Sequence, residues 1–242
     1  MELPVFLAVL AAAVMHAGWN VLVKLKLDRF LSLCLIQTIM GFMGLVMIAV
    51  FPLPALASLP YAVASGVLHL GYNLFLARSY RTGDLSQVYP IARGAAPLLT
   101  LAVTWTFMHE ELTLMGGAGV AVLVAGIWMI SLLGNRGLRL DGLTLFFAIG
   151  TSVFIAAYTI VDGMGGRASG QPSSYAGMVF AFDALFLAAT ALGMRGPGIL
   201  REVAPYWKTG VVGALLSVGA YWIAIWAMTK APIAVVAALR ET

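Results

Sequence analysis

Two arginines lie within stretches of the sequence that are largely apolar. Arg93 is the only charged residue of the run 85–108, and Arg240 lies in a similar setting in the run 231–242. A charged side chain at the depth of a bilayer is costly and is seldom kept there without a task. A guanidinium group presents a planar fork of N–H donors that matches a carboxylate or a phosphate. The two residues therefore predict a binding site for an anionic or zwitterionic group.

The segment around Arg93 has one polar face if it is helical. At about 100° per residue, six side chains lie within about 40° of the Arg93 direction: Ser86, Tyr89, Arg93, Pro97, Thr100 and Thr104. Pro90, Gly94 and Pro97 are expected to break this helix near the arginine. The hydroxyl groups could instead serve hydrogen bonds between helices. The stripe predicts a face that points into a helix bundle and away from lipid.

The pattern His-x-Gly-aromatic-Asn occurs twice, at 16–20 and at 69–73. Its histidine and asparagine are four residues apart and share one helix face. A neutral histidine can hydrogen-bond a ligand or relay a proton, and it can equally be a packed side chain with satisfied hydrogen bonds. The aromatic residue could stack on a substrate or simply pack. The candidate binding residues from this pattern are His16, Trp19, Asn20, His69, Tyr72 and Asn73.

Asp183 is predicted to lie in the middle of the apolar segment 175–194, and no other carboxylate is expected so deep in a membrane helix. It could neutralise a buried arginine, or it could carry a coupling proton. Metal binding is not expected, because two histidines without nearby intramembrane carboxylates make a poor site. Hydrolase, kinase and dinucleotide-binding motifs do not occur, so neither an enzyme nor a cofactor is expected.

The composition indicates the environment of these residues. The chain has 242 residues, of which 62% are hydrophobic and 10% charged. Soluble domains average about 25% charged residues, so we expect an all-α integral membrane protein. The net charge of +4 comes from residues between the apolar runs, where membrane topology explains it and nucleic-acid binding is not indicated. Cys34 is the only cysteine, which excludes an intramolecular disulfide and a cysteine metal cluster.

Crossing a bilayer takes about 20 apolar residues in a helix. Eight segments meet this requirement: 3–23, 31–51, 60–77, 85–108, 112–133, 142–161, 175–194 and 207–228. A ninth begins near Ala231 and ends at Thr242, which is too short to span alone at about 1.5 Å per residue. The connection 162–174 contains four glycines and is predicted to be the longest and most mobile loop.

Spacing in the two halves of the chain suggests an internal repeat. Tyr72 precedes Arg93 by 21 residues, and Tyr221 precedes Arg240 by 19. Two halves of five helices each would have opposite orientations, as in many secondary transporters. We therefore expect a ten-helix bundle whose ninth helix is incomplete and whose tenth is missing; the alternative is an eight-helix protein with a short tail. The expected repeats are residues 1–133 and 142–242.

Lysine and arginine are distributed unevenly between the two sets of loops. One set holds ten of these residues and the other holds two. Because basic residues accumulate in cytoplasmic loops, this bias places the N-terminus outside the cytoplasm. The expected location is the cell (inner) membrane, as a multi-pass protein.

The predicted helix 112–133 is rich in glycine. Gly119 and Gly126 are seven residues apart and share one face. Small residues allow two helix backbones to approach closely. The pattern predicts close helix packing or the seam of a homodimer.

The stretch DLSQVYPIARGAAPLLTLAVTWTFMHEELTLMGGAGVAVLVAGI, residues 84–127, resembles helices 4 and 5 of EamA-type members of the drug/metabolite transporter superfamily. The likeness consists of a proline-bearing helix with Arg93, a glutamate at its far end (Glu110 or Glu111) and a glycine-rich helix after it. HAGWN at 16–20 and VVAALRET at 235–242 resemble the branch with arginines in helices 4 and 9.

The resemblance implies ten helices in two inverted repeats around a central cavity that faces alternate sides of the membrane. It also implies export or import of small metabolites. Family members are described with both termini inside the cell, which disagrees with the distribution of basic residues in this chain.

These observations together predict a secondary transporter of a small anionic or zwitterionic metabolite. Arg93 and Arg240 would bind its charged group. The apolar part of the cavity would be lined by aromatic residues: Trp19, Tyr72, Tyr89 and Tyr221. The alternative is a non-transporting membrane subunit or receptor in which the arginines are structural.

Overall fold

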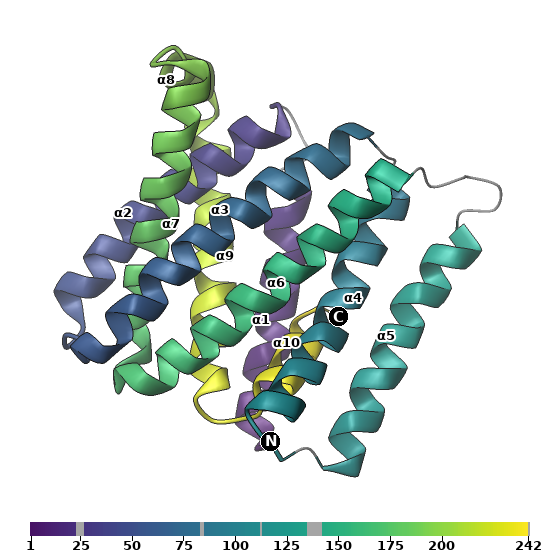
Figure 1. The fold of residues 1–242 in the computed structure, drawn as a ribbon. Coiled ribbons are helices and arrows are strands. Elements are labelled where there is room, and N and C mark those ends of the chain that lie inside the picture. The colour runs from purple at the N-terminus through teal and green to yellow at the C-terminus, as the bar shows by residue number, and fades with distance from the viewer. Residues whose placement is uncertain (23–26, 83–84, 112, 135–141, 242) are drawn as a thin grey trace.

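The structure is a computed structural model that describes residues 1–22, 27–82, 85–111, 113–134 and 142–241, with only the backbone described at 80–82, 85–91, 128 and 130–134. These residues are largely helical and include no strand (Figure 1). The α-helices are α1 (Leu3–Leu22), α2 (Arg29–Val50), α3 (Leu59–Thr82), α4 (Leu85–Phe107), α5 (Leu114–Gly134), α6 (Gly142–Ser169), α7 (Pro172–Arg195), α8 (Ile199–Val203), α9 (Trp207–Met228) and α10 (Ile233–Arg240). Two 3₁₀ turns join them, η1 (Leu56–Ser58) and η2 (Ala204–Tyr206).

Several of these helices suit a lipid environment. Within the described residues, five helical segments are long and apolar enough to cross a membrane: Leu3–Leu22, Arg29–Val50, Gly142–Ser169, Pro172–Arg195 and Ile199–Met228. Large apolar side chains remain exposed on the outside of the bundle, among them Phe107 and Leu114. In water such a surface would be unfavourable, whereas lipid accommodates it. The chain is an all-α, multi-pass membrane protein, as its composition predicts.

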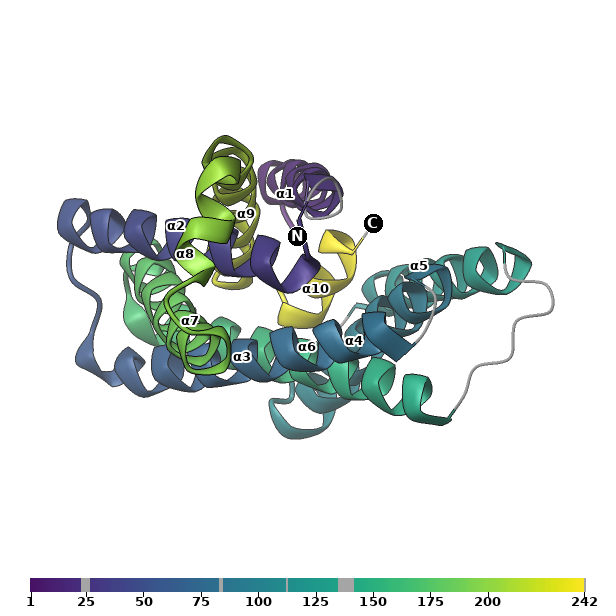
Figure 2. The same ribbon diagram turned by 90° about the horizontal axis from the view of Figure 1, so that it is seen from above.

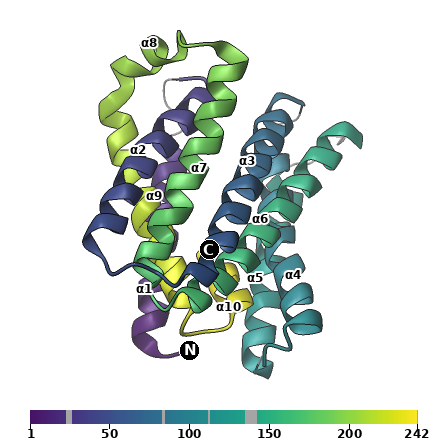
Figure 3. The same ribbon diagram turned by 60° about the vertical axis from the view of Figure 1, so that its left-hand side comes forward.

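The helices pack as two groups (Figure 3). One contains α1, α2, α7 and α9, and the other contains α3, α4, α5 and α6. The most extensive contacts pair α2 with α7, α3 with α6, and α1 with α9. Seen from above, the short helix α10 lies between α1 and α4 (Figure 2), and it contacts both. Residues at the end of α10 therefore reach the interior of the bundle.

The helix α4 is continuous from Leu85 to Phe107, so the prediction that its prolines break it is wrong. Membrane helices tolerate proline and glycine because neighbouring groups satisfy the freed backbone. The polar stripe does face inward, since Arg93, Thr100 and Thr104 are all buried. The threonine hydroxyls bind carbonyl oxygens of α4 itself, and thus they do not link helices.

The predicted loop 162–174 is wrong as well. The helix α6 continues to Ser169, and α7 begins at Pro172. The glycines of the last turns of α6 allow close packing: a Cβ at Gly165 would collide with the hydroxyl of Tyr175, and a Cβ at Gly163 would collide with Ile233. Glycine is common in loops, but here it makes room for side chains from α7 and α10.

The helix α5 packs against the bundle through Val120 and Val124, which contact Ala238 of α10. A Cβ added at Gly119 or Gly126 would meet no atom within 4 Å. The two glycines therefore do not mediate close helix packing within the described chain. The homodimer remains a prediction.

One polar cluster ties the start of α10 to two other helices. Glu110, just after α4, accepts a hydrogen bond from the backbone N–H of Ile233 at 2.9 Å. Its other oxygen lies 2.6 Å from Arg167 of α6, and Arg167 also donates to the carbonyl oxygens of Met228 and Ala231. The first N–H groups of a helix lack partners within it. Glu110, which is far from α10 in sequence, therefore caps its N-terminus and fixes its position.

Candidate functional site

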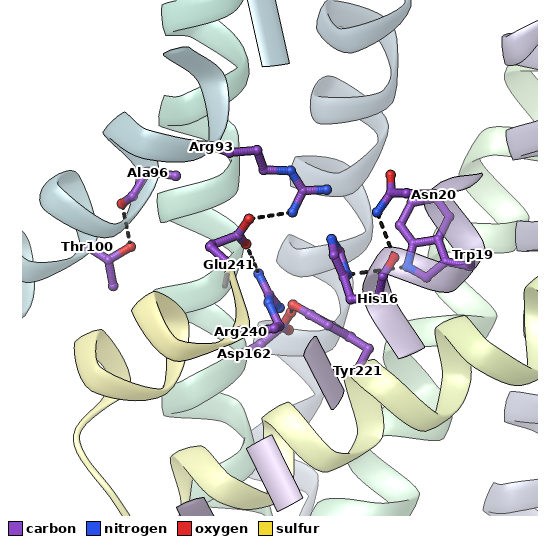
Figure 4. Close-up of polar contacts among 10 residues, drawn as sticks. All are labelled: His16, Trp19, Asn20, Arg93, Ala96, Thr100, Asp162, Tyr221, Arg240 and Glu241. Carbon is purple, nitrogen blue, oxygen red and sulfur yellow. Dashed lines mark hydrogen bonds and ion pairs between the residues drawn. The ribbon is translucent and has the colours of Figure 1, made fainter. Parts of the chain in front are cut away.

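The two predicted arginines meet on one carboxylate (Figure 4). Arg93 Nη1 of α4 donates to Glu241 Oε2 at 2.7 Å, and Arg240 Nη2 donates to Glu241 Oε1 at 3.3 Å. All three side chains are at least 94% buried. The apolar surroundings of the two arginines predicted them as site residues, but Glu241 was not predicted, although it directly follows Arg240 in the chain. The only signal in the sequence was that the two residues are adjacent, and helical periodicity does not predict that adjacent side chains contact each other.

A cavity of about 60 Å³ lies beside this cluster. It is bordered by seven of the predicted residues: His16, Trp19, His69, Tyr72, Asp183, Tyr221 and Arg240. Sequence analysis did not select its other polar wall residues, Gln37, Tyr158 and Ser217. At about 10–15 Å³ per water, the cavity holds a few waters in this conformation. A ligand larger than these waters would fit only if the helices around the cavity moved apart.

Aromatic rings form the wall of the cavity next to Arg240. The ring of Tyr158 stacks on His69 with centroids 4.0 Å apart, and Tyr72 meets Tyr158 edge-on at 5.7 Å. The guanidinium carbon of Arg240 lies 5.2 Å from the centroid of the Tyr221 ring. This distance suits a cation–π contact, which holds the arginine against the wall.

The pattern at 16–20 gives two residues that border the cavity and one that does not. Trp19 Nε1 donates to His16 Nδ1 at 3.3 Å, while His16 Nε2 is buried without a hydrogen-bond partner among the described residues. Asn20 donates to the carbonyl oxygen of His16 at 2.8 Å and is absent from the cavity wall. The side chain of Asn20 thus hydrogen-bonds the backbone of its own helix, α1.

In the pattern at 69–73, His69 and Tyr72 likewise border the cavity and Asn73 does not. His69 Nδ1 lies 3.0 Å from the carbonyl oxygen of Ser65, and its ring faces the cavity. Asn73 is buried outside the cavity wall and accepts a hydrogen bond from Gln37 at 3.4 Å, which links α3 to α2. The side chain of Tyr89, another predicted binding residue, lies outside the described residues.

Asp183 is buried in the middle of α7, as predicted, and it borders the cavity. No ion pair with it occurs among the described residues, and its Oδ1 lacks a hydrogen-bond partner there. The carboxylate in contact with both arginines is Glu241. The geometry therefore does not support Asp183 as their counter-ion.

A further buried carboxylate belongs to Asp162, a residue that sequence analysis assigned to a loop. It lies inside α6 and is fully buried. Tyr175 donates to its Oδ1 at 3.1 Å, and Tyr221 donates to its Oδ2. Tyr221 therefore touches both Asp162 and Arg240. Within the described part of the chain, no group of three or more potential metal ligands is present.

Comparison with known proteins places this bundle in a family. The family model of the EamA-like transporter family matches residues 3–132, which is more than half of the 242-residue chain. A crystal structure described only as that of a protein is 18% identical and aligns over 100% of this chain and 84% of its own, with a TM-score of 0.74. At this identity the likeness shows the fold alone. No curated protein sequence matches. With the family model covering α1 to α5, the chain belongs to the EamA-like transporter family and is a membrane transporter.

Proposed function

We propose that the chain is a secondary transporter, and not an enzyme, that moves a small anionic or zwitterionic metabolite across the cell (inner) membrane. The observation that carries this proposal is the convergence of Arg93 and Arg240 on the carboxylate of Glu241. The two cations come from different helices, α4 and α10. A carboxylate held between two guanidinium groups is the arrangement that an anionic substrate would require.

The charge of this cluster favours a further anion. Arg93 and Arg240 contribute two positive charges and Glu241 one negative charge, so these three side chains carry +1. A buried net charge is costly, and while the nearby carboxyl group of Asp162 is neutral, a monoanion bound beside Arg240 would offset this charge. The Nε of Arg240, which has no hydrogen-bond partner among the described residues, is one donor for this contact. The aromatic rings of Tyr158 and Tyr221 would then contact the apolar part of the substrate.

The packing of the helices supports alternating access through two inverted repeats, 1–133 and 142–242. In the first repeat, the third long helix is α3, and it packs along α6, which is the first helix of the second repeat. In the second repeat, the third long helix is α9, and it packs along α1, which is the first helix of the first repeat. The second helices, α2 and α7, pack on each other. A two-fold relation between the halves generates these pairings, and such halves rock around a central site in many transporters.

Transport into proteoliposomes tests the proposal. The probes form a carboxylate panel of radiolabelled amino acids, monocarboxylates and dicarboxylates. We expect uptake of at least one member by the wild type, none by Arg93→Ala, and reduced uptake by Arg93→Lys, because an ammonium group cannot donate in a fork. Arg201→Ala changes an exposed arginine and should transport normally. Full uptake by Arg93→Ala would refute the role of Arg93.

The rival function is a membrane subunit or receptor in which the buried arginines only hold the bundle together. It is favoured by the low exposure of Arg93 and Glu241, which is typical of structural ion pairs. Thermal unfolding in detergent separates the two. If Arg93→Ala remains folded and still loses uptake, the transport role stands. A wild type that moves no member of the panel, together with an unfolded Arg93→Ala, supports the structural role.

A further inference from the structure

The carboxyl group of Asp162 has its own set of hydrogen-bond donors, which is separate from the arginines that bind Glu241. Each of its oxygens accepts a hydrogen bond from a phenol: Oδ1 from Tyr175 of α7 and Oδ2 from Tyr221 of α9. Asp162 lies seven residues before the end of α6, or about 10 Å along the helix axis at about 1.5 Å per residue. Two phenol donors, from α7 and α9, and the hydroxyl group of Ser65 of α3 therefore enclose one carboxyl group inside the membrane.

Gly165 makes room for one of these donors. A Cβ at this position would overlap the hydroxyl group of Tyr175. Gly165 follows Asp162 by three residues, so both lie on the same face of α6. The glycine thus opens a notch through which Tyr175, which is fully buried, reaches the carboxyl group. The notch and the two phenols form a site shaped around Asp162.

No ion pair with Asp162 occurs among the described residues. The polar and titratable groups that act on it come from five helices and are Tyr158 of α6, Ser65 of α3, Tyr175 and Asp183 of α7, Tyr221 of α9 and Arg240 of α10. His69 of α3 lies beyond Tyr221, with which its ring is in edge-on contact, and Arg93 of α4 lies beyond Arg240 and Glu241. Arg240 forms no ion pair with Asp162 among the described residues, but its charge acts on Asp162, and Tyr221 contacts both residues. A carboxyl group enclosed in this way can shed its charge by binding a proton.

We propose that Asp162 is a proton-binding site and that its charge state is transmitted through Tyr221 to the anion site at Arg240. A proton taken from water adds to Oδ2 as the pH falls and leaves again as the pH rises, and no covalent bond between heavy atoms changes. The ionised carboxylate accepts the O–H of Tyr221, whereas the neutral acid donates its own O–H to the Tyr221 oxygen. Figure 4 shows Asp162, Tyr221 and Arg240 next to one another.

The sign of the coupling follows from charge. The Asp162 carboxylate attracts Arg240 and repels an anion bound beside it. Binding of a proton removes both effects, so a substrate carboxylate should bind more tightly as the pH falls. By linkage, a bound carboxylate should promote proton uptake by the same factor. This second half of the proposal rests on the proposed transport function; the proton site itself does not.

The proton site is tested by infrared spectroscopy of the wild type in lipid nanodiscs during a pH titration. In the difference between the spectra of the wild type and Asp162→Asn, we expect the carbonyl stretch of one protonated carboxyl group that grows as the pH falls. The same stretch should persist in Asp183→Asn, which changes another buried aspartate. Identical carbonyl stretches in the wild type and Asp162→Asn at every pH overturn the assignment. If Asp162→Asn does not fold, Tyr175→Phe takes its place. It removes one donor to the ionised form, so the midpoint should move to higher pH, and an unmoved midpoint contradicts the site.

The coupling is tested by binding of the carboxylate-panel member with the highest affinity. Wild-type affinity should rise as the pH falls, whereas Asp162→Asn should bind tightly at all pH values. Equal pH dependence in both proteins refutes the coupling. If no panel member binds, the proposed function fails, and the infrared titration still decides whether Asp162 binds a proton.

Discussion

At the scale of residues, the interior is organised by contacts between buried charges. Arg93 and Arg240 are held in the membrane interior by Glu241. Both arginines have a known partner because the end of α10 reaches α4. Removing one member of a buried charge cluster is costly, since the remaining charges stay buried. The stability of the bundle should therefore depend strongly on Glu241.

The substitution Glu241→Gln keeps the shape of the side chain and removes its charge. We expect it to lower the free energy of unfolding by about 3–5 kcal/mol, because two guanidinium groups lose their shared anion. Chemical unfolding in detergent measures the change. The matched control is Glu202→Gln, which alters an exposed glutamate of α8. Equal stability of the two variants would show that Glu241 does not neutralise the arginines.

A second substitution tests the notch beside Asp162. Gly165→Ala places a Cβ against the hydroxyl of Tyr175, and we expect a loss of about 1–3 kcal/mol in the free energy of unfolding from overpacking. Gly126→Ala is the control, because its Cβ meets nothing and alanine favours a helix by about 1 kcal/mol over glycine. The two variants should therefore change stability in opposite directions. A stabilising Gly165→Ala would contradict the close packing of Tyr175 on α6.

At the scale of elements, the position of α10 decides whether the arginines can meet. The helix is short, and its first N–H groups are capped by Glu110 from the end of α4. Arg167 holds the turn before it through Met228 and Ala231. The proposed anion site thus depends on a polar cluster at the opposite end of α10.

Amide hydrogen exchange measures this dependence. Glu110→Gln keeps an acceptor but loses the charge that favours a helix N-terminus and Arg167, so we expect faster exchange in a peptide covering 229–240. A lost cap typically costs about 1 kcal/mol. The neighbouring Glu111 is exposed, and Glu111→Gln should leave exchange in this peptide unchanged. Identical exchange in the two variants would remove Glu110 from the positioning of α10.

At the scale of the whole molecule, the orientation in the membrane is predicted by the loops alone. The excess of lysine and arginine places residue 136 in the cytoplasm, whereas the family resemblance would place it outside. Reporter fusions at residue 136 distinguish the two. We expect activity from a reporter that works only in the cytoplasm, and activity from one that works only outside would reverse the orientation of the chain.

Local sequence properties determined much of the fold. Apolar length predicted 207–228 for the helix found at Trp207–Met228, and 3–23 for the helix found at Leu3–Leu22. The burial of Arg93, Arg240 and Asp183 also followed from apolar surroundings. These predictions succeed because helix formation and membrane insertion depend on residues that are near each other in the chain.

The membrane class, several helix bounds and the buried arginines are thus properties that the sequence determined by itself. Only the tertiary structure showed what the arginines and Asp162 contact. Arg93 and Glu241 are 148 residues apart, and Tyr221 and Asp162 are 59 apart, so no local pattern joins them. The glycines near Asp162 indicated a loop until α7 and α10 were seen to pack against them. The physical reason is that a buried charge requires a partner, but which partner it finds depends on how distant helices pack.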